Sequence, residues 1–154
     1  MEAPDHGITV DEYQRFLSYG TQLIDVHDQL RGMLDDLRDG VVPQRDLTAH
    51  CLTFCAALTA HHTGEDREVF PLLAARHPAL RDFLAGLERD HQVIAGILTR
   101  VTTLDGDARQ EELAGLDAIL RTHFLGEEKR LTAVLDALDT SVGLTPLTDA
   151  VRFE

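Results

Sequence analysis

Apolar residues recur along the chain at steps of three and four, the spacing that places them on one face of an α-helix. The pattern runs four times, and short stretches containing Gly, Pro and Asp separate the runs. It predicts helices over residues of about 10–39, 44–76, 79–104 and 107–138. Short connections between long helices favour antiparallel neighbours, so we expect an all-α fold, an up-down-up-down antiparallel four-helix bundle.

Local signals support these boundaries. Thr9 and Glu12 have the spacing of a capping box at the start of the first helix. Asp107 with Gln110 has the pattern of a cap on the fourth. Pro71 lacks a backbone N–H, so the second helix should kink or end near it.

Residues that bind metals interrupt the apolar stripe of every predicted helix. The first and third helices carry one histidine each, and the second and fourth each carry a histidine followed four residues later by a glutamate. Residues four apart lie one above the other on a helix, so each pair offers a nitrogen and an oxygen to one point. In a chain with 8 histidines and 27 acidic residues, pairs at this spacing also arise by chance. The position of these pairs within the apolar stripes is the stronger evidence for a metal site. The six candidate ligands are His27, His61, Glu65, His91, His123 and Glu127.

Four histidines and two glutamates in one core predict bound metal. A carboxylate buried without a partner costs several kcal/mol or takes up a proton. Imidazole and carboxylate together suit iron, manganese or zinc, whereas calcium and magnesium prefer oxygen alone. Six donors do not saturate two ions unless carboxylates bridge them, so we expect Glu65 and Glu127 to bridge and other positions to admit dioxygen, peroxide or a related small ligand.

A competing pair, His62 and Asp66, lies one residue further along, about 100° around the helix. It shares its stripe with Leu52, Cys55, Val69 and Leu73. We favour His61 and Glu65 because their stripe is more apolar and matches the register of the pair on the fourth helix. His62 and Asp66 are then expected to orient the ligands from outside. Glu128 has two interpretations, the same orienting role or a solvated charge.

These motifs, with the run Val69-Phe70-Pro71-Leu72-Leu73 after the first pair, resemble the hemerythrin-like proteins of the HHE cation-binding family. The resemblance covers the chain from His27 to Glu128. It implies a hemerythrin-like four-helix bundle with a non-haem di-iron centre, which holds two iron ions on the six ligands named above, with manganese or zinc as possible substitutes. Family functions include oxygen binding, oxygen or iron sensing, and the handling of peroxide or nitric oxide.

One departure from the family bears on function. Oxygen-carrying hemerythrins have a second histidine on the third helix and an aspartate five residues after the histidine of the fourth. Here Leu87 and Ala95 lie at spacing four from His91, and the aspartate position holds Glu128. The pattern therefore disfavours oxygen transport and favours peroxide chemistry, with a catalase-like or peroxidase-like activity as one form, or sensing in oxidative stress.

Two other classes of protein compete with this interpretation. A ferritin-like di-iron oxidase or iron-handling protein needs a GluxxHis motif on each of two helices, whereas this chain has only Glu88 with His91. A metal-free helical interaction module predicts no response to iron.

Composition narrows the remaining choices. The 154 residues fit one domain, 1–154, with a short tail after the fourth helix. The net charge of -13 argues against nucleic acid and anionic membrane surfaces as partners. An acidic start and the lack of a long apolar run favour a cytoplasmic protein, while the oligomeric state stays open. Cys51 and Cys55, one turn apart, are expected to be small buried residues rather than a disulfide.

Overall fold

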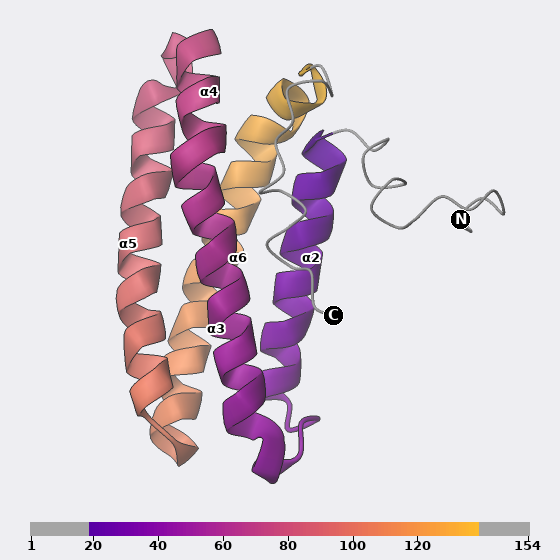
Figure 1. Ribbon diagram of the computed structural model, residues 1–154, viewed down its shortest axis with the longest axis vertical. Coiled ribbons are helices and arrows are strands. Elements are labelled where there is room, and N and C mark those ends of the chain that lie inside the picture. The colour runs from indigo at the N-terminus through magenta and orange to yellow at the C-terminus, as the bar shows by residue number, and fades with distance from the viewer. Residues whose placement is uncertain (1–18, 139–154) are drawn as a thin grey trace, which may run out of the picture.

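The computed structural model describes residues 19–138, which are helical almost throughout (Figure 1). The elements are α2 (Tyr19–Arg38), the 3-10 turn η1 (Gln44–Asp46), α3 (Leu47–Gly64), the π-helical turn η2 (Glu65–Val69), α4 (Phe70–Arg76), the 3-10 turn η3 (Pro78–Leu80), α5 (Arg81–Thr103) and α6 (Gly106–Asp136). The all-α class is confirmed for these residues. No helix among them is both long enough and apolar enough to cross a membrane.

The long helices lie side by side (Figure 1). Helix α6 packs against α2 and α5, and α3 packs against the same two helices. The second predicted helix, residues 44–76, is built from η1, α3, η2 and α4 in succession. The fourth begins at Gly106 after Asp105, which makes no side-chain cap hydrogen bond, so the cap expected at Asp107 is wrong. The capping box at Thr9 and Glu12 lies outside the described residues.

The buried apolar residues form two clusters, and the candidate ligands lie between them on every helix. One cluster includes Leu30, Leu58, Ile94 and Leu116, and the other includes Leu23, Leu73, Leu87 and Leu131. Cys51 and Cys55 are free thiols within the first cluster, as expected of small apolar residues. The metal-binding residue types are therefore held in mid-bundle by packed side chains on both sides.

The π-helical turn η2 changes which face of the second helical segment is buried. The N–H of Phe70 bonds to the carbonyl of Glu65, five residues back, so one more residue fits into this turn than into an α-helical one. One extra residue rotates the following face by about 100°. The buried face thus continues from Glu65 to Leu73, which is fully buried, and not to Leu72, which is only partly buried.

Candidate metal centre

The structure brings the six predicted ligands together, adds His62, and arranges the seven residues in two groups. The first group is His27, His61, Glu65 and Glu127, and the second is His62, Glu65, His91 and His123. Within each group, one ligand atom per residue lies within 4.8 Å of all the others, and all seven side chains are buried. Glu65 belongs to both groups, which is the place of a bridging carboxylate.

Carboxylates outside the centre hold three of the histidine rings by Nδ1. The pairs are His27 with Glu128 at 2.6 Å, His91 with Asp66 at 2.8 Å, and His123 with Asp90 at 3.1 Å. Nδ1–H of each ring donates a hydrogen bond to its carboxylate, so the proton stays on Nδ1 and the Nε2 lone pair is free to face the centre. Asp66 and Glu128 thus take the orienting role that the sequence suggested, and Asp90 adds a third such contact that it did not.

The rings of His91 and His123 approach so closely that a cation bound to both nitrogens would stabilise the contact. Their Nε2 atoms lie 3.1 Å apart. Burial, with a smaller contribution from His123 and His27, lowers the pKa of His91 to about 3, so its ring is neutral near pH 7. Two lone pairs at this distance repel each other, whereas two nitrogens bound at right angles to one ion at about 2.1 Å are about 3.0 Å apart.

The two glutamates lie between histidines of both groups. Glu65 Oε1 is 3.5 Å from His61 Nε2 and 3.4 Å from His91 Nε2. Glu127 Oε2 is 3.4 Å from His123 Nε2 and 3.8 Å from His27 Nε2. These distances are slightly longer than those of neighbouring ligands on one ion, and a bound ion would draw the atoms inward.

Buried polar atoms without partners are concentrated at this centre. Among residues 19–138, the buried side-chain nitrogen and oxygen atoms without a hydrogen-bond partner are His27 Nε2, both ring nitrogens of His61, His62 Nε2, and all four carboxylate oxygens of Glu65 and Glu127. Each such atom costs about 1–3 kcal/mol. Metal ions would satisfy all of these atoms except one ring nitrogen of His61, which carries the proton of the neutral imidazole, so the residues present fit a metal centre.

Electrostatics lead to the same conclusion. Burial, helped by the neighbouring Glu127, raises the pKa of Glu65 well above its usual value. Burial and the surrounding histidines lower the pKa values of His61 and His62 well below the usual range. Without metal, burial therefore favours the uncharged forms of His61, His62 and Glu65. A bound cation would instead favour the charged carboxylate of Glu65.

A comparison with protein-family models matches residues 21–135 to the hemerythrin HHE cation-binding domain. The chain belongs to this family. The matched residues include all seven donors and run from α2 almost to the end of α6. Comparisons with curated proteins and with solved structures gave no match.

Aromatic side chains enclose the HHE centre. Phe124 stacks on His27 with 3.9 Å between ring centroids, and Phe70 stacks less closely on His91, at 5.6 Å. Arg31 lies over the Phe124 ring and donates a hydrogen bond of 2.6 Å to Glu128. These contacts fix ring orientations and limit the entry of water from these sides.

The structure adds His62, which the sequence had placed as an orienting residue, to the inward-facing donors, because the HHE centre is wider than one helical stripe. Its ring is 5% exposed, stacks on His91 at 3.8 Å between centroids, and has its Nε2 among the second group of donors. Two residues about 100° apart on α3 both point inward because α3 faces α2 on one side and α5 on the other. His61 joins His27 of α2, and His62 joins His91 of α5. The stripe that His62 shares with Cys55 and Val69, both buried, was the available signal.

Proposed function

We propose that this HHE domain binds two metal ions, iron in the first place, and lets dioxygen, peroxide or a related small ligand react there in the handling or sensing of oxidative stress. The proposal rests on the two buried groups of donors, which share Glu65. Several of their side-chain nitrogen and oxygen atoms have no hydrogen-bond partner. Iron held by imidazole and carboxylate supplies redox chemistry and open positions for small ligands. Manganese or zinc suits the same donors.

Seven residues, one more than the sequence suggested, act as ligands in this proposal. His62, His91 and His123 would hold one ion and His27 and His61 the other, with the carboxylates of Glu65 and Glu127 within reach of both. His62 supplies the nitrogen that Ala95, at spacing four from His91, does not. Five nitrogens and two bridges make nine bonds, which leaves open positions on two ions that take about six ligands each.

The rest of the chain orients and shields the centre. Asp66, Asp90 and Glu128 keep the protons on Nδ1, so that Nε2 stays a donor. Phe124 and Phe70 keep bulk water from two of the rings. A shielded site strengthens the electrostatic contribution of each carboxylate.

We also propose the up-down-up-down order for the bundle. The two apolar clusters alternate in order along successive helices: α2 begins with Leu23 of one cluster and continues to Leu30 of the other, and α3 with α4 runs from Leu58 back to Leu73. Helices α5 and α6 repeat the alternation. This supports opposite directions for chain neighbours.

The rival classes find less support. Glu88, needed for a ferritin-like motif with His91, belongs to neither donor group. A metal-free interaction module would leave the unpartnered donors in its core, at considerable cost to stability. The cytoplasmic location and the exclusion of nucleic acid and membrane partners stay predictions, since they rest on sequence alone.

The test is the iron content per chain and the near-ultraviolet and visible spectrum after anaerobic reconstitution, before and after peroxide is added. We expect about two irons in the wild type, a charge-transfer band that peroxide changes, and loss of both in His61→Ala. His62→Ala should retain less iron than the wild type, because one ion loses a ligand.

His50→Ala is the matched control, since His50 is an exposed histidine of the same helix, α3. It should behave as the wild type does. No iron and no band in the wild type would contradict the proposal and favour the interaction module. Full iron in His62→Ala would remove His62 from the ligand set without affecting the other six.

A further inference from the structure

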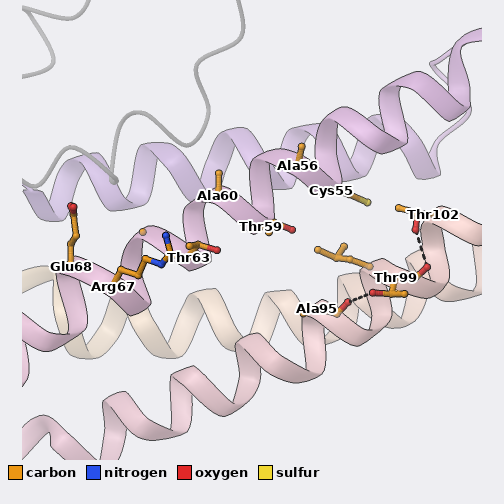
Figure 2. Close-up of a pocket in the computed structure, with 12 residues that line it drawn as sticks. Cys55, Ala56, Thr59, Ala60, Thr63, Arg67, Glu68, Ala95, Thr99 and Thr102 are labelled. Atoms are coloured by element: carbon orange, nitrogen blue, oxygen red, sulfur yellow. Dashed lines mark hydrogen bonds between the residues drawn. The ribbon is translucent and has the colours of Figure 1, made fainter.

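A groove between α3 and α5 opens on the side of the centre where His62 and His91 lie. Its outer part has a volume of about 890 Å³ and is bordered by α3, its extension η2, and α5 (Figure 2). A smaller inner cavity of about 180 Å³ is lined by His62, His91 and Asp66 together with neighbouring residues of the same helices. The two spaces share the wall residues Thr59, Thr63, Ala95 and Leu98. They therefore form a path from the surface to the imidazole rings.

Small side chains on both helices create the path. Ala56, Thr59, Ala60 and Thr63 border it from α3, and Ala95, Thr99 and Thr102 from α5 (Figure 2). The hydroxyls of Thr99 and Thr102 bond to carbonyls of their own helix, so the α5 wall presents mainly methyl groups. A histidine at position 95 would occupy the space where the two cavities meet.

A buried donor of the proposed metal centre lies at the inner end of the groove. His62 lines the inner cavity, is 5% exposed, and has an Nε2 atom without a hydrogen-bond partner. By contrast, the phenyl rings of Phe124 and Phe70 cover His27 and the other face of the His91 region. The groove is thus an approach to the centre that no aromatic ring covers.

Size and charge restrict what enters. The inner cavity, at about 180 Å³, is larger than dioxygen or hydrogen peroxide requires. The outer groove carries charges of both signs, Arg67 and Glu68, whereas the inner cavity has the carboxylate of Asp66, so an anion is disfavoured next to the imidazole rings. Methyl and hydroxyl groups suit a ligand with one polar and one apolar end.

We propose that this groove admits a small uncharged alkyl hydroperoxide to the His62 and His91 side of the centre, and that Thr59 and Ala95 set the size limit from opposite walls. The inference rests on the proposed metal centre and names its route of entry and its ligand class.

Ala95→Phe and Thr59→Phe test the route from the two walls, and Val93→Phe is the control. Ala95 and Thr59 are exposed in the groove, so a phenyl ring there fills space without displacing core residues. Val93 is an exposed residue of α5, 56% accessible, and borders neither cavity. Iron content and melting temperature are measured for all four proteins.

The rate of entry is followed by the spectral change on adding tert-butyl hydroperoxide or imidazole. The neutral form of imidazole binds iron without oxidising it, so its rate, measured above the imidazolium pKa, reports binding separately from turnover. We expect both groove variants to keep the wild-type iron content. Their spectra should change at least about tenfold more slowly than the wild type with either probe. The decrease in rate should be smaller when hydrogen peroxide, a smaller molecule, is added instead. Val93→Phe should respond at the wild-type rate.

Each other outcome overturns a different claim. Groove variants that hold iron and respond at the wild-type rate overturn the route while the metal centre stands. Loss of iron in the groove variants also counts against the route, since the walls would then hold the ligands in place. A wild type that accepts hydrogen peroxide but not tert-butyl hydroperoxide overturns the ligand class, and a wild type without iron overturns the centre itself.

Discussion

Single carboxylates outside the centre determine what its histidines can do. Asp66, Asp90 and Glu128 are each only partly buried, yet each holds the Nδ1 side of a buried ring. Arg31 and His27 donate to Glu128, and although burial alone would raise its pKa, these hydrogen bonds lower the pKa of Glu128 below its usual value. The carboxylate stays charged and keeps the ring oriented. At this scale, the charge outside the donor set is as informative as the donors.

Asp66→Asn isolates this effect, because the amide keeps the shape and one acceptor oxygen but loses the charge. We expect the affinity for the ion at His91 to fall about 10-fold to 100-fold, the range found for such supporting contacts. Competition with a chelator of known affinity measures it. Asp82→Asn, at an exposed site in the first turn of α5, should leave the affinity unchanged. Equal affinities for both variants and the wild type would show that the Asp66 contact is incidental.

At the scale of the helices, the sequence predicted most of the structure and failed where periodicity changed. Stripes at steps of three and four located the helices and brought His27, His61, His91 and His123 to one level. The same assumption of one regular period forced a choice between the stripes of His61 and His62. The π-helical turn at Glu65–Val69 moves the buried face from the first stripe to the second, and an analysis that follows one regular period along the whole helix cannot represent this change. The outer partner Asp90, the residue before His91, was not singled out in the sequence; its contact is with His123 on α6 and not with the neighbouring His91.

The packing of α2 on α6 gives a prediction at this scale. The Gly20 N–H donates to Asp136 Oδ1 at 2.9 Å, and a Cβ at Gly20 would lie 2.5 Å from the backbone oxygen of Thr132. Gly20→Ala should therefore force the two helices apart and lower the free energy of unfolding by about 1–3 kcal/mol. Thermal or denaturant unfolding of the metal-free protein measures this.

Gly32→Ala, on the same helix, should have the opposite sign. Nothing lies within 4 Å of a Cβ built at Gly32. Alanine is the better helix former in the middle of a helix, so stability should rise by about 0.5–1 kcal/mol. A loss of stability in both variants would mean that close approach of α2 and α6 is not what Gly20 provides.

For the whole molecule, the centre is a polar layer between two apolar clusters. Eight buried atoms without partners, at about 1–3 kcal/mol each, are comparable with the entire stability of a small domain, about 5–15 kcal/mol. The fold tolerates this layer because packed residues on both sides hold the histidines and glutamates in place. Metal binding then stabilises the folded state by mass action, since the unfolded chain does not assemble the site.

Glu65→Met separates the two contributions. Methionine has a similar length and no group to satisfy, so the metal-free variant should be more stable than the metal-free wild type by about 1–3 kcal/mol. Metal should raise the melting temperature of the wild type and leave that of the variant nearly unchanged, because the shared carboxylate is lost. Melting curves with a chelator and with excess zinc, whose binding involves no redox change, give both comparisons.

Glu68→Met, at an exposed position of the same turn, should keep the metal response and the wild-type stability. If Glu65→Met instead destabilised the metal-free protein, the carboxyl group would have a role in the core that its lack of hydrogen-bond partners does not reveal, and the polar layer would not depend on metal for its stability.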